Sequence, residues 1–287
     1  MILGDFVLKK IIIGTAQFGM DYGISNARGK IPYDEVFAIL NECAKKKIKF
    51  LDTAYSYGDS EKVIGNFIQN FGNKFEIISK LPSCKSEEVE FFLNSSLNKL
   101  GITKLYGYLI HNFKAYQLEP SLWDALENLK YHGKVGKIGF SLYFPQELEF
   151  LLFNNLQFDL IQIPYSIFDQ RFDLYFKELK SRGVEIHVRS VFLQGVIFKK
   201  LPELSAFFLP LKEKIKTLNY LSLQAGVPVS TLALNFALHN KLIDKVIVGI
   251  DSIRHLYEII AAVHYYKKIK DIIPKLADLK EDAEKIL

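Results

Sequence analysis

The chain has 287 residues, of which 49% are hydrophobic and 24% charged, and its formal net charge is +5 at pH 7. This composition is ordinary for a globular protein, and the positive charge is too small and too dispersed to indicate a nucleic-acid-binding protein. No stretch approaches the roughly 18 consecutive apolar residues of a membrane span, and no basic segment followed by an apolar run begins the chain. We therefore expect no membrane partner and no signal peptide.

The cysteines and histidines do not indicate a bound metal. Cys43 and Cys84 are the two cysteines, and they form neither a paired metal motif nor a disulfide framework, which favours a reducing cytoplasm. The six histidines are scattered along the chain. None lies at a ligand spacing such as HExxH, so we expect no metal site.

Short apolar runs alternate with amphipathic segments along the chain. Residues 11–13 are a β-branched run that predicts a first strand, and Pro32 begins a segment whose apolar residues share one helical face. The same patterns recur to the end of the chain. They predict strands over 11–13, 48–51, 75–80, 106–110, 137–140, 158–161, 184–188 and 246–249, and helices that begin near residues 32, 60 and 86 and cover 121–132, 145–154, 174–182, 211–225, 230–240 and 253–266.

This alternation predicts the α/β class and a closed (β/α)8 TIM barrel, because the buried parallel strands of such a fold read as continuous apolar runs. No Pro- or Ser-rich linker interrupts the series, so we expect residues 1–287 to form a single domain. Two segments lie outside the repeat. One is an irregular insertion at about 195–210, and the other is an amphipathic C-terminal tail at about 267–287.

Polar residues mark the ends of consecutive predicted strands. Asp52, Lys80 and His111 end three of them, and Tyr57 follows in the loop after Asp52. Alone, such residues would be a cap, a solvated lysine, a structural histidine and a loop aromatic. The C-terminal ends of barrel strands face one shared pocket, however, so we expect these side chains to lie together there.

These residue types suit the delivery of a proton to a carbonyl oxygen. A free tyrosine has a pKa near ~10, and a nearby ammonium held by a carboxylate is expected to lower it. A histidine can orient the same oxygen by a hydrogen bond. The missing hydride source implies a nicotinamide cofactor. No Gly-x-Gly-x-x-Gly follows a predicted strand, so a Rossmann site is not indicated.

Short motifs at these strand ends resemble the aldo-keto reductase family, and the resemblance extends from about residue 11 to residue 266. They are Phe50-Leu51-Asp52-Thr53-Ala54-x-x-Tyr57-Gly58, Ser79-Lys80, Ile110-His111 and Gly139-Phe140-Ser141. The family implies a nicotinamide-dependent barrel that reduces aldehydes and ketones, with a small-molecule carbonyl substrate. By position, the resemblance makes Tyr57 the general acid, lets Lys80 and Asp52 tune it, and makes His111 the group that orients the substrate.

The resemblance also implies positions that hold the cofactor. They are Gly14, Thr15, Asp52, Ser141, Gln162, Arg189, Ser190, Val191, Leu193, Gly195, Gly249, Asp251, Arg254 and Glu258. The sequence departs from the family pattern at some positions in and beside this set. Leu142 replaces a usual asparagine, and Arg189 stands where many relatives have an aromatic residue. The resemblance implies NADP(H) as cofactor, and in this sequence Asp251 would repel a 2′-phosphate while Arg254 would attract one. We therefore expect NADP(H) to be favoured over NAD(H), with dual use left open.

Residues 14–23 resemble a bacterial subgroup of the family that is often encoded among genes for surface-sugar synthesis, which suggests a carbohydrate carbonyl as substrate. Two alternatives remain at this stage. One is a barrel lyase or aldolase with Lys80 as a Schiff-base nucleophile. The other is a non-catalytic subunit that senses the nicotinamide cofactor. Nothing in the sequence specifies an oligomeric state.

Overall fold

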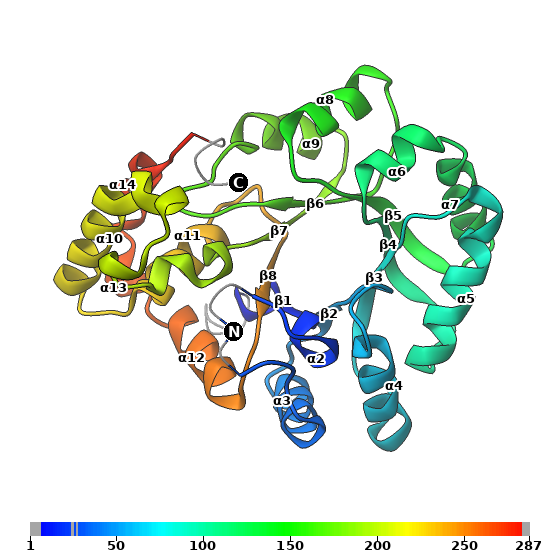
Figure 1. Cartoon of the computed structure of the whole chain (residues 1–287), viewed down its shortest axis with the longest axis horizontal. Helices are drawn as coiled ribbons and strands as arrows, with labels where there is room; N and C mark the ends of the chain where they lie inside the picture. Colours follow the sequence, from blue (N-terminus) through cyan, green and yellow to red (C-terminus); the bar gives the residue numbers. More distant parts are fainter. Residues whose placement is uncertain (1–6, 24–25, 27, 283–287) are drawn as a thin grey trace.

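The computed structural model describes residues 7–23, 26 and 28–282. Its parallel strands follow one another around a closed barrel, and the first strand pairs with the last (Figure 1). This confirms the predicted (β/α)8 fold. The strands are β1 (Ile11–Gly14), β2 (Phe50–Asp52), β3 (Glu76–Leu81), β4 (Leu105–Ile110), β5 (Val135–Ser141), β6 (Leu160–Pro164), β7 (Glu185–Arg189) and β8 (Lys245–Gly249).

Helices surround the barrel and cover the outer face of the strands (Figure 1). Gly101 and Gly226 end two of them in the left-handed conformation that glycine adopts most easily. The α-helices are α2 (Ala16–Gly19), α3 (Tyr33–Lys45), α4 (Ser60–Phe71), α5 (Val89–Leu100), α6 (Phe113–Leu118), α7 (Leu122–Tyr131), α8 (Pro145–Phe153), α9 (Phe176–Ser181), α10 (Lys212–Ala225), α11 (Val229–Leu238), α12 (Ile253–Val263), α13 (Tyr266–Ile269) and α14 (Ile273–Leu276).

The strands bury apolar residues on both faces, which explains their continuous apolar runs. Ile11 and Ile13 point to the outer core beneath the helices, whereas Ile12, between them, belongs to a separate cluster inside the barrel. Its other buried members come from different strands around the barrel. They are Ile78, Leu109, Leu160 and Ile247. The barrel interior is therefore packed, and any site has to lie at its ends.

Two short helices, α2 and α6, were not expected from the sequence. They have four and six residues, which is too short for the apolar periodicity to register. Both lie in loops that leave the C-terminal ends of strands, β1 and β4 respectively. These loops shape the mouth of the barrel.

The insertion and the tail are more structured than expected. Within the expected irregular segment, the short 3-10 helices η3 (Leu193–Phe198), η4 (Leu201–Glu203) and η5 (Ala206–Leu211) follow one another. The tail is not one helix, because it is divided into α13, α14 and the 3-10 helix η6 (Ala277–Leu279). Its Leu276 and Leu279 are buried, so its apolar face does pack on the barrel. Residues 1–6 and 283–287, at the expected signal-free N-terminus and in the tail, lie outside the described residues.

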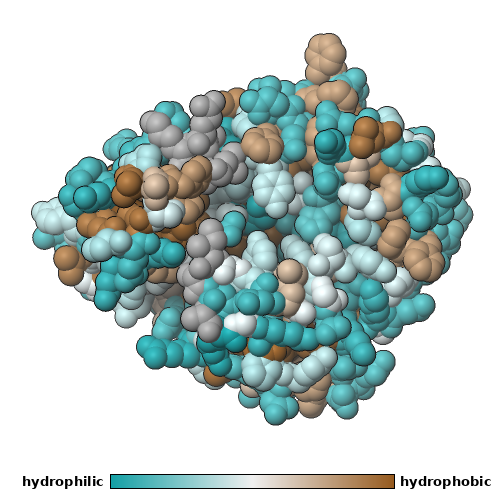
Figure 2. Space-filling view, viewed as in Figure 1, coloured by the Kyte–Doolittle hydropathy of each residue, from teal (hydrophilic) through white to brown (hydrophobic). Residues whose placement is uncertain are grey.

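The surface facing the viewer in Figure 2 is mainly hydrophilic, and apolar side chains gather at the left, over the region of α10 and α14. Among the described residues, no single helix is long and apolar enough to cross a membrane. Residues 206–225 and 229–238 meet the length and composition test only as a pair of helices bent by 95°. The second of these, α11, is almost wholly buried in the protein, as a core helix is.

Candidate active site

A buried ion pair lies at the C-terminal ends of β2 and β3. The ammonium of Lys80 donates to Oδ2 of Asp52 over 2.7 Å and to the carbonyl of Thr53 over 2.8 Å. The other carboxylate oxygen of Asp52 accepts from the side-chain amide of Gln162, on β6, over 2.8 Å. Asp52 is 3% exposed and Lys80 1% exposed. Each charge therefore has hydrogen-bonding partners that offset the cost of its burial.

Tyr57 lies above this pair because of the turn that carries it. Its N–H donates to the carbonyl of Ala54, and Gly58 follows with a φ of 56°. The helix α2 packs directly on this turn, since a Cβ atom on Gly19 would lie 1.9 Å from the carbonyl oxygen of Tyr57. Only glycine allows that approach. The phenol oxygen of Tyr57 is then 3.4 Å from the ammonium of Lys80, which is a long hydrogen bond.

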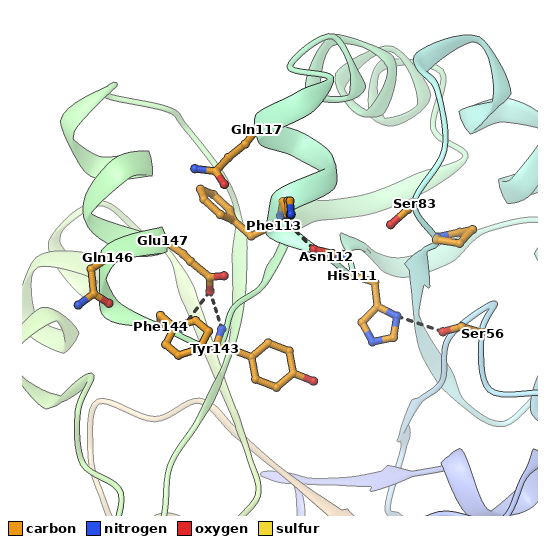
Figure 3. A pocket seen from close by; sticks show the side chains of 12 residues that line it. Ser56, Ser83, His111, Asn112, Phe113, Gln117, Tyr143, Phe144, Gln146 and Glu147 are labelled. Atoms are coloured by element: carbon orange, nitrogen blue, oxygen red, sulfur yellow. Dashed lines mark hydrogen bonds between the residues drawn. The ribbon is translucent and has the colours of Figure 1, made fainter. Parts of the chain in front are cut away.

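His111 completes the group from the loop after β4. Its ring meets the ring of Tyr57 edge to face, with 5.7 Å between the centroids. The hydroxyl of Ser56 lies 3.2 Å from Nδ1 of His111 (Figure 3). If this hydroxyl donates, Nδ1 is the acceptor and Nε2 carries the ring proton. The structure thus brings together all four of the residues that the sequence placed at one pocket.

The electrostatics differ from the sequence-based expectation in one respect. The pKa of Tyr57 is raised above its usual range, mainly by burial and next by the carboxylate of Asp52. The expected lowering is not found, because the charge of Lys80 is balanced by Asp52 at 2.7 Å. Burial and the charge of Lys80 lower the pKa of His111 to about 4. At neutral pH the phenol is therefore protonated and the imidazole is neutral.

A cavity of about 250 Å³ opens above this group and reaches across the mouth of the barrel to the N-terminus of α12. Most of the residues that the resemblance assigned to the cofactor line it. They are Gly14, Thr15, Asp52, Ser141, Gln162, Arg189, Ser190, Val191, Gly195, Gly249 and Asp251. Leu193, Arg254 and Glu258 do not. Leu193 is buried, and Arg254 forms an ion pair with Glu258 over 3.0 Å on the surface, where the two side chains are 87% and 55% exposed.

The sequence reading missed several aromatic residues of this cavity. Tyr22 and Tyr143 line it near Tyr57, Phe192 lines it just before the insertion, and Phe198 lines it from within the insertion. Tyr143 was the one with a sequence signal, because it comes directly after the strand-end pair Ser141-Leu142. The others depend on how the loops fold back over the barrel.

The loop after β7 has an unusual backbone. Ser190, Leu193 and Gln194 all have positive φ angles, of 62°, 48° and 52°, and Gly195 follows at 90°. Non-glycine residues adopt this conformation at a cost of order 1 kcal/mol or more, and such strain gathers at ligand sites.

The opposite end of the cavity is formed by Asp251 and the first turn of α12. His255 Nδ1 lies 3.3 Å from Asp251 Oδ1, and the contact lowers the pKa of Asp251 to about 2. The hydroxyl of Ser252 accepts from the N–H of His255, and Arg28 donates to the backbone carbonyl of Asp251. Amide and hydroxyl groups at one end, a strained loop in the middle and a helix N-terminus at the other suit the parts of a nicotinamide dinucleotide.

A second cavity, of about 750 Å³, adjoins the first and shares His111 and Tyr143 with it (Figure 3). Its walls come from α6, from the start of α8 and from the loops after β3 and β5. Aromatic, amide and hydroxyl side chains line it together with one lysine and one carboxylate. They are Ser56, Ser83, Asn112, Phe113, Lys114, Gln117, Tyr143, Phe144, Gln146 and Glu147.

The fold and these site residues indicate a class of enzyme, and comparison with known proteins identifies that class. The model of the aldo/keto reductase family matches residues 10–279, so the chain belongs to the aldo/keto reductase family. It is therefore an oxidoreductase, of a family that uses nicotinamide cofactors and acts on small-molecule carbonyl substrates.

Individual relatives agree with this assignment. The chain is 26% identical over 280 residues to L-galactose dehydrogenase of Arabidopsis thaliana, covering 91% of this chain and 86% of that protein. Among solved structures it resembles the aldo-keto reductase AKR11C1 from Bacillus halodurans, with a TM-score of 0.76, 21% identity and coverage of 93% and 92%. It also resembles the glycerol dehydrogenase AKR11B4 from Gluconobacter oxydans, with a TM-score of 0.74, 16% identity and coverage of 93% and 90%. At these identities the two solved structures establish the fold.

Proposed function

We propose that this protein reduces an aldehyde or ketone to an alcohol with a hydride from NAD(P)H, and that Tyr57 donates the proton. The observation that carries the proposal is the contact of a protonated phenol with a buried ammonium–carboxylate pair beside a neutral imidazole. In this arrangement the phenol of Tyr57 lies 3.4 Å from Lys80, and Lys80 lies 2.7 Å from Asp52. Asp52, Tyr57 and His111 line the same cavity, and Lys80 is buried beneath them.

The bound reduced nicotinamide would supply the hydride to the carbonyl carbon. Tyr57 gives its hydroxyl proton to the carbonyl oxygen as negative charge develops there, and solvent later restores that proton. His111 points its Nε2–H at the same oxygen and orients it, with Ser56 holding the tautomer over 3.2 Å. Lys80 stabilises the phenolate that forms, and Asp52 keeps Lys80 in place. A positioned general acid of this kind typically contributes about 10²–10⁴-fold to the rate.

Ser141 and Gln162 are the groups that would hold the nicotinamide carboxamide. They are 2% and 1% exposed, and both line the cavity. The amide of Gln162 is already oriented by its bond to Asp52, so its oxygen can accept from the carboxamide while its nitrogen stays on Asp52. Cofactor binding and the ion pair at Lys80 are therefore coupled through one side chain.

For the substrate we propose a carbohydrate or polyol carbonyl. The second cavity begins at His111, where the reacting carbonyl is oriented, and extends away from the cofactor. Tyr143 and Phe144 present partly exposed rings of the kind that sugars pack against, and no hydrogen bond is found for the amides of Gln117 or Gln146 within the described part of the chain. Two of the relatives are named for L-galactose and glycerol, which are both polyhydroxylated.

For the cofactor we propose a modest preference for NADP(H) over NAD(H), with dual use. Asp251 is charged at neutral pH, since its pKa is lowered to about 2, and it would oppose a 2′-phosphate. The side chain of Arg254 extends into solvent and can turn from Glu258 towards a phosphate. The positive end of the α12 dipole adds to that attraction, although the N–H groups of Ile253 and His255 are already bonded to Glu35 and Ser252.

The geometry gives less support to the alternatives. A Schiff-base lyase needs a neutral, accessible amine, whereas Lys80 is 1% exposed and bonded to a carboxylate. A subunit that only senses the cofactor has no need of the phenol and imidazole at the cavity mouth. Cys43 and Cys84 are both free thiols, which is compatible with the reducing cytoplasm that we propose as the location.

A titration followed by an activity panel tests the proposal. The protein is titrated with NADPH and with NADH, and each complex is then mixed with aldehydes, ketones, aldoses and ketoses. We expect saturable binding of NADPH and carbonyl-dependent oxidation of the cofactor, fastest with polyhydroxylated substrates. If neither NADPH nor NADH binds, the proposal is refuted. Trapping of a carbonyl compound on Lys80 by borohydride would favour the lyase instead.

A further inference from the structure

Arg189, the last residue of β7, lines the cofactor cavity close to the proposed catalytic groups. Its guanidinium carbon lies 4.1 Å from the centre of the Tyr143 ring, and one of its nitrogens donates to the carbonyl of Leu142 over 2.9 Å. A stacked and hydrogen-bonded guanidinium of this kind is fixed in direction. The loop after β5 therefore holds a cation at the mouth of the barrel.

The charge of Arg189 is not compensated locally. Lys80 is neutralised by Asp52 at 2.7 Å, and His111 is uncharged at neutral pH because its pKa is about 4. Asp251, the next carboxylate of the cavity, is in contact with His255 at its far end. Across residues 7–23, 26 and 28–282, no ion pair joins Arg189 to a carboxylate. The part of the cavity around Tyr57 thus carries a net positive charge.

The charge of Arg189 acts on the residues that we propose to carry out the reaction. It lowers the pKa of Tyr57, of Lys80 and of His111, although other causes outweigh it at the phenol. The hydride donor must stand next to a carbonyl group that Tyr57 and His111 both touch. Whatever its detailed pose, the nicotinamide ring therefore lies within the field of Arg189.

We propose that Arg189 makes the site distinguish the oxidation states of the cofactor, so that it binds the reduced form more tightly than the oxidised form. This inference is based on the proposed function. Loss of the hydride turns a neutral dihydropyridine ring into a pyridinium cation, while the ribose, phosphate and adenine parts stay the same. A fixed guanidinium repels only the cation. The site then fills preferentially with the reduced cofactor and promotes release of the oxidised form, at the cost of making the bound dihydropyridine a slightly weaker hydride donor.

Coulomb's law gives the expected size of the difference in affinity between the reduced and the oxidised cofactor. Two unit charges several Å apart near a protein surface interact by a few kcal/mol at most, and partial exposure reduces this, so we expect the reduced form to bind ~10-fold more tightly. By linkage, a tenfold difference raises the midpoint potential of the bound two-electron couple by ~30 mV. Both effects should weaken as salt is added.

The experiment measures dissociation constants rather than turnover. NADPH and NADP⁺ are each titrated calorimetrically into the wild-type protein and into Arg189→Met and Arg189→Lys. We expect the NADP⁺ to NADPH ratio of dissociation constants to be ~10 in the wild type and near unity in Arg189→Met, and to be largely kept in Arg189→Lys, which retains the charge. Arg254→Ala serves as the matched control, because it removes a cation far from the ring and should leave the ratio unchanged.

The outcomes separate this inference from the proposed function. Failure of both cofactors to bind the wild-type protein would refute the proposed function itself. Binding with equal affinity, or an equal loss for both cofactors in Arg189→Met, would overturn the inference and place the guanidinium against a part common to both forms. If Arg189→Met does not fold, Arg189→Gln removes the charge while keeping a donor for the carbonyl of Leu142, and the same ratio is measured.

Discussion

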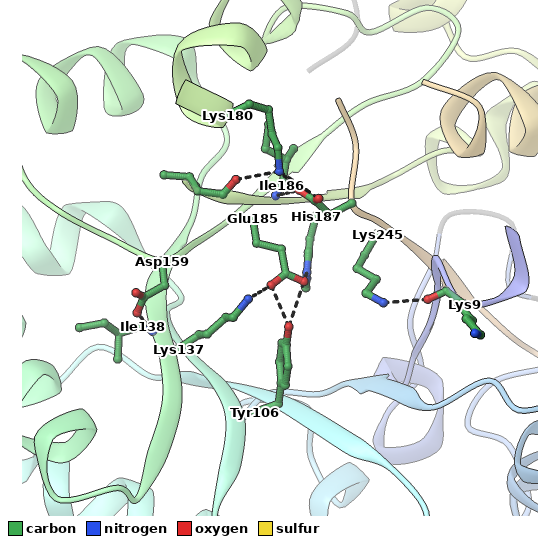
Figure 4. Close-up of polar contacts among 12 residues, drawn as sticks. Lys9, Tyr106, Lys137, Ile138, Asp159, Lys180, Glu185, Ile186, His187 and Lys245 are labelled. Carbon is green, nitrogen blue, oxygen red and sulfur yellow. Dashed lines mark hydrogen bonds and ion pairs between the residues drawn. The ribbon is translucent and has the colours of Figure 1, made fainter. Parts of the chain in front are cut away.

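The barrel contains two polar clusters of matching composition, one at each end. The mouth cluster is Asp52, Lys80, Tyr57 and His111, at the C-terminal ends of β2 to β4. The base cluster has the same kinds of residue, near the N-terminal ends of β4, β5 and β7 (Figure 4). It consists of Glu185, Lys137, Tyr106 and His187.

The two clusters differ in where their polar atoms point. In the base cluster Glu185 accepts from Tyr106 and from His187, each over 2.8 Å, and from Lys137. Burial alone would raise the pKa of Glu185, but these donors outweigh it and lower the pKa. In the mouth cluster Tyr57 and His111 face a cavity. In the base cluster the polar groups all bond to the carboxylate of Glu185, so they stabilise the fold. In the mouth cluster the phenol of Tyr57 and the imidazole of His111 remain open to a cavity, so they can act on a ligand.

Removal of Lys80 should have the largest effect. Lys80→Met leaves the buried carboxylate of Asp52 without its cation, so we expect the free energy of unfolding in urea to fall by about 3–5 kcal/mol, together with most of the activity. The double variant Lys80→Met/Asp52→Asn removes both charges and should recover much of the stability but not the activity. Full activity in Lys80→Met, or no loss of stability, would contradict the role of the pair.

The corresponding change in the base cluster should affect stability alone. Glu185→Gln leaves Lys137 and His187 without their carboxylate, and we expect a loss of about 2–3 kcal/mol in unfolding free energy with an unchanged kcat. Because the folded-state pKa of Glu185 is lowered, its stabilisation is complete above the unfolded value of about 4.3 and disappears as the pH falls through the folded one. The difference between wild type and variant should therefore be constant near neutral pH and shrink in acid. A lower kcat at unchanged stability would contradict this assignment.

The mouth cluster could be anticipated from the sequence, and the base cluster could not. Asp52, Lys80 and His111 follow apolar strands directly, and strand ends converge in a barrel whatever the details of packing. The end of β3 was misplaced by one residue, since it reaches Leu81, without effect on this conclusion. Glu185 and His187 gave a weaker signal, as polar residues two apart in a buried strand. Their partners come from other strands, and only the closed barrel shows that they meet.

The direction of the pKa shift at Tyr57 could not be predicted from the sequence either. The spacing of Tyr57 and Lys80 suggested a lowered phenol pKa, but burial and the balance between Lys80 and Asp52 decide it in the opposite sense. Neither the burial of Tyr57 nor the distance between Lys80 and Asp52 can be predicted from the order of the residues. The stacking of Arg189 on Tyr143 likewise depends on the conformations of two loops.

His111 gives a prediction on pH dependence. Its pKa of about 4 means that the imidazole stays neutral above roughly pH 5, so kcat/KM should show no inflection from this residue through the neutral range. His111→Asn should lower kcat/KM by about 10–100-fold without changing cofactor affinity, because it alters the orientation of the carbonyl. An inflection near the ordinary histidine value of ~6.5 that disappears in His111→Asn would contradict the neutral form.

The smallest effect is expected at Arg254, outside both clusters. Because this side chain is 87% exposed, Arg254→Ala should weaken NADPH by only about two- to fivefold and leave NADH unchanged. Asp251→Ser removes the opposing charge and should strengthen NADPH by a similar factor. Both are measured by titration with the two cofactors. Equal losses for NADPH and NADH in Arg254→Ala would place this arginine away from the 2′-phosphate.

The central claim is that Tyr57 donates the proton whereas Tyr106, in a cluster of the same composition, only supports the fold. The direct test is the single-turnover rate of cofactor oxidation by a carbonyl substrate in Tyr57→Phe and Tyr106→Phe, with the cofactor saturating. We predict a rate about 10²–10⁴-fold below wild type in Tyr57→Phe with unchanged stability, and a wild-type rate with a lowered Tm in Tyr106→Phe. A wild-type rate in Tyr57→Phe, or equal losses in both variants, would contradict the account.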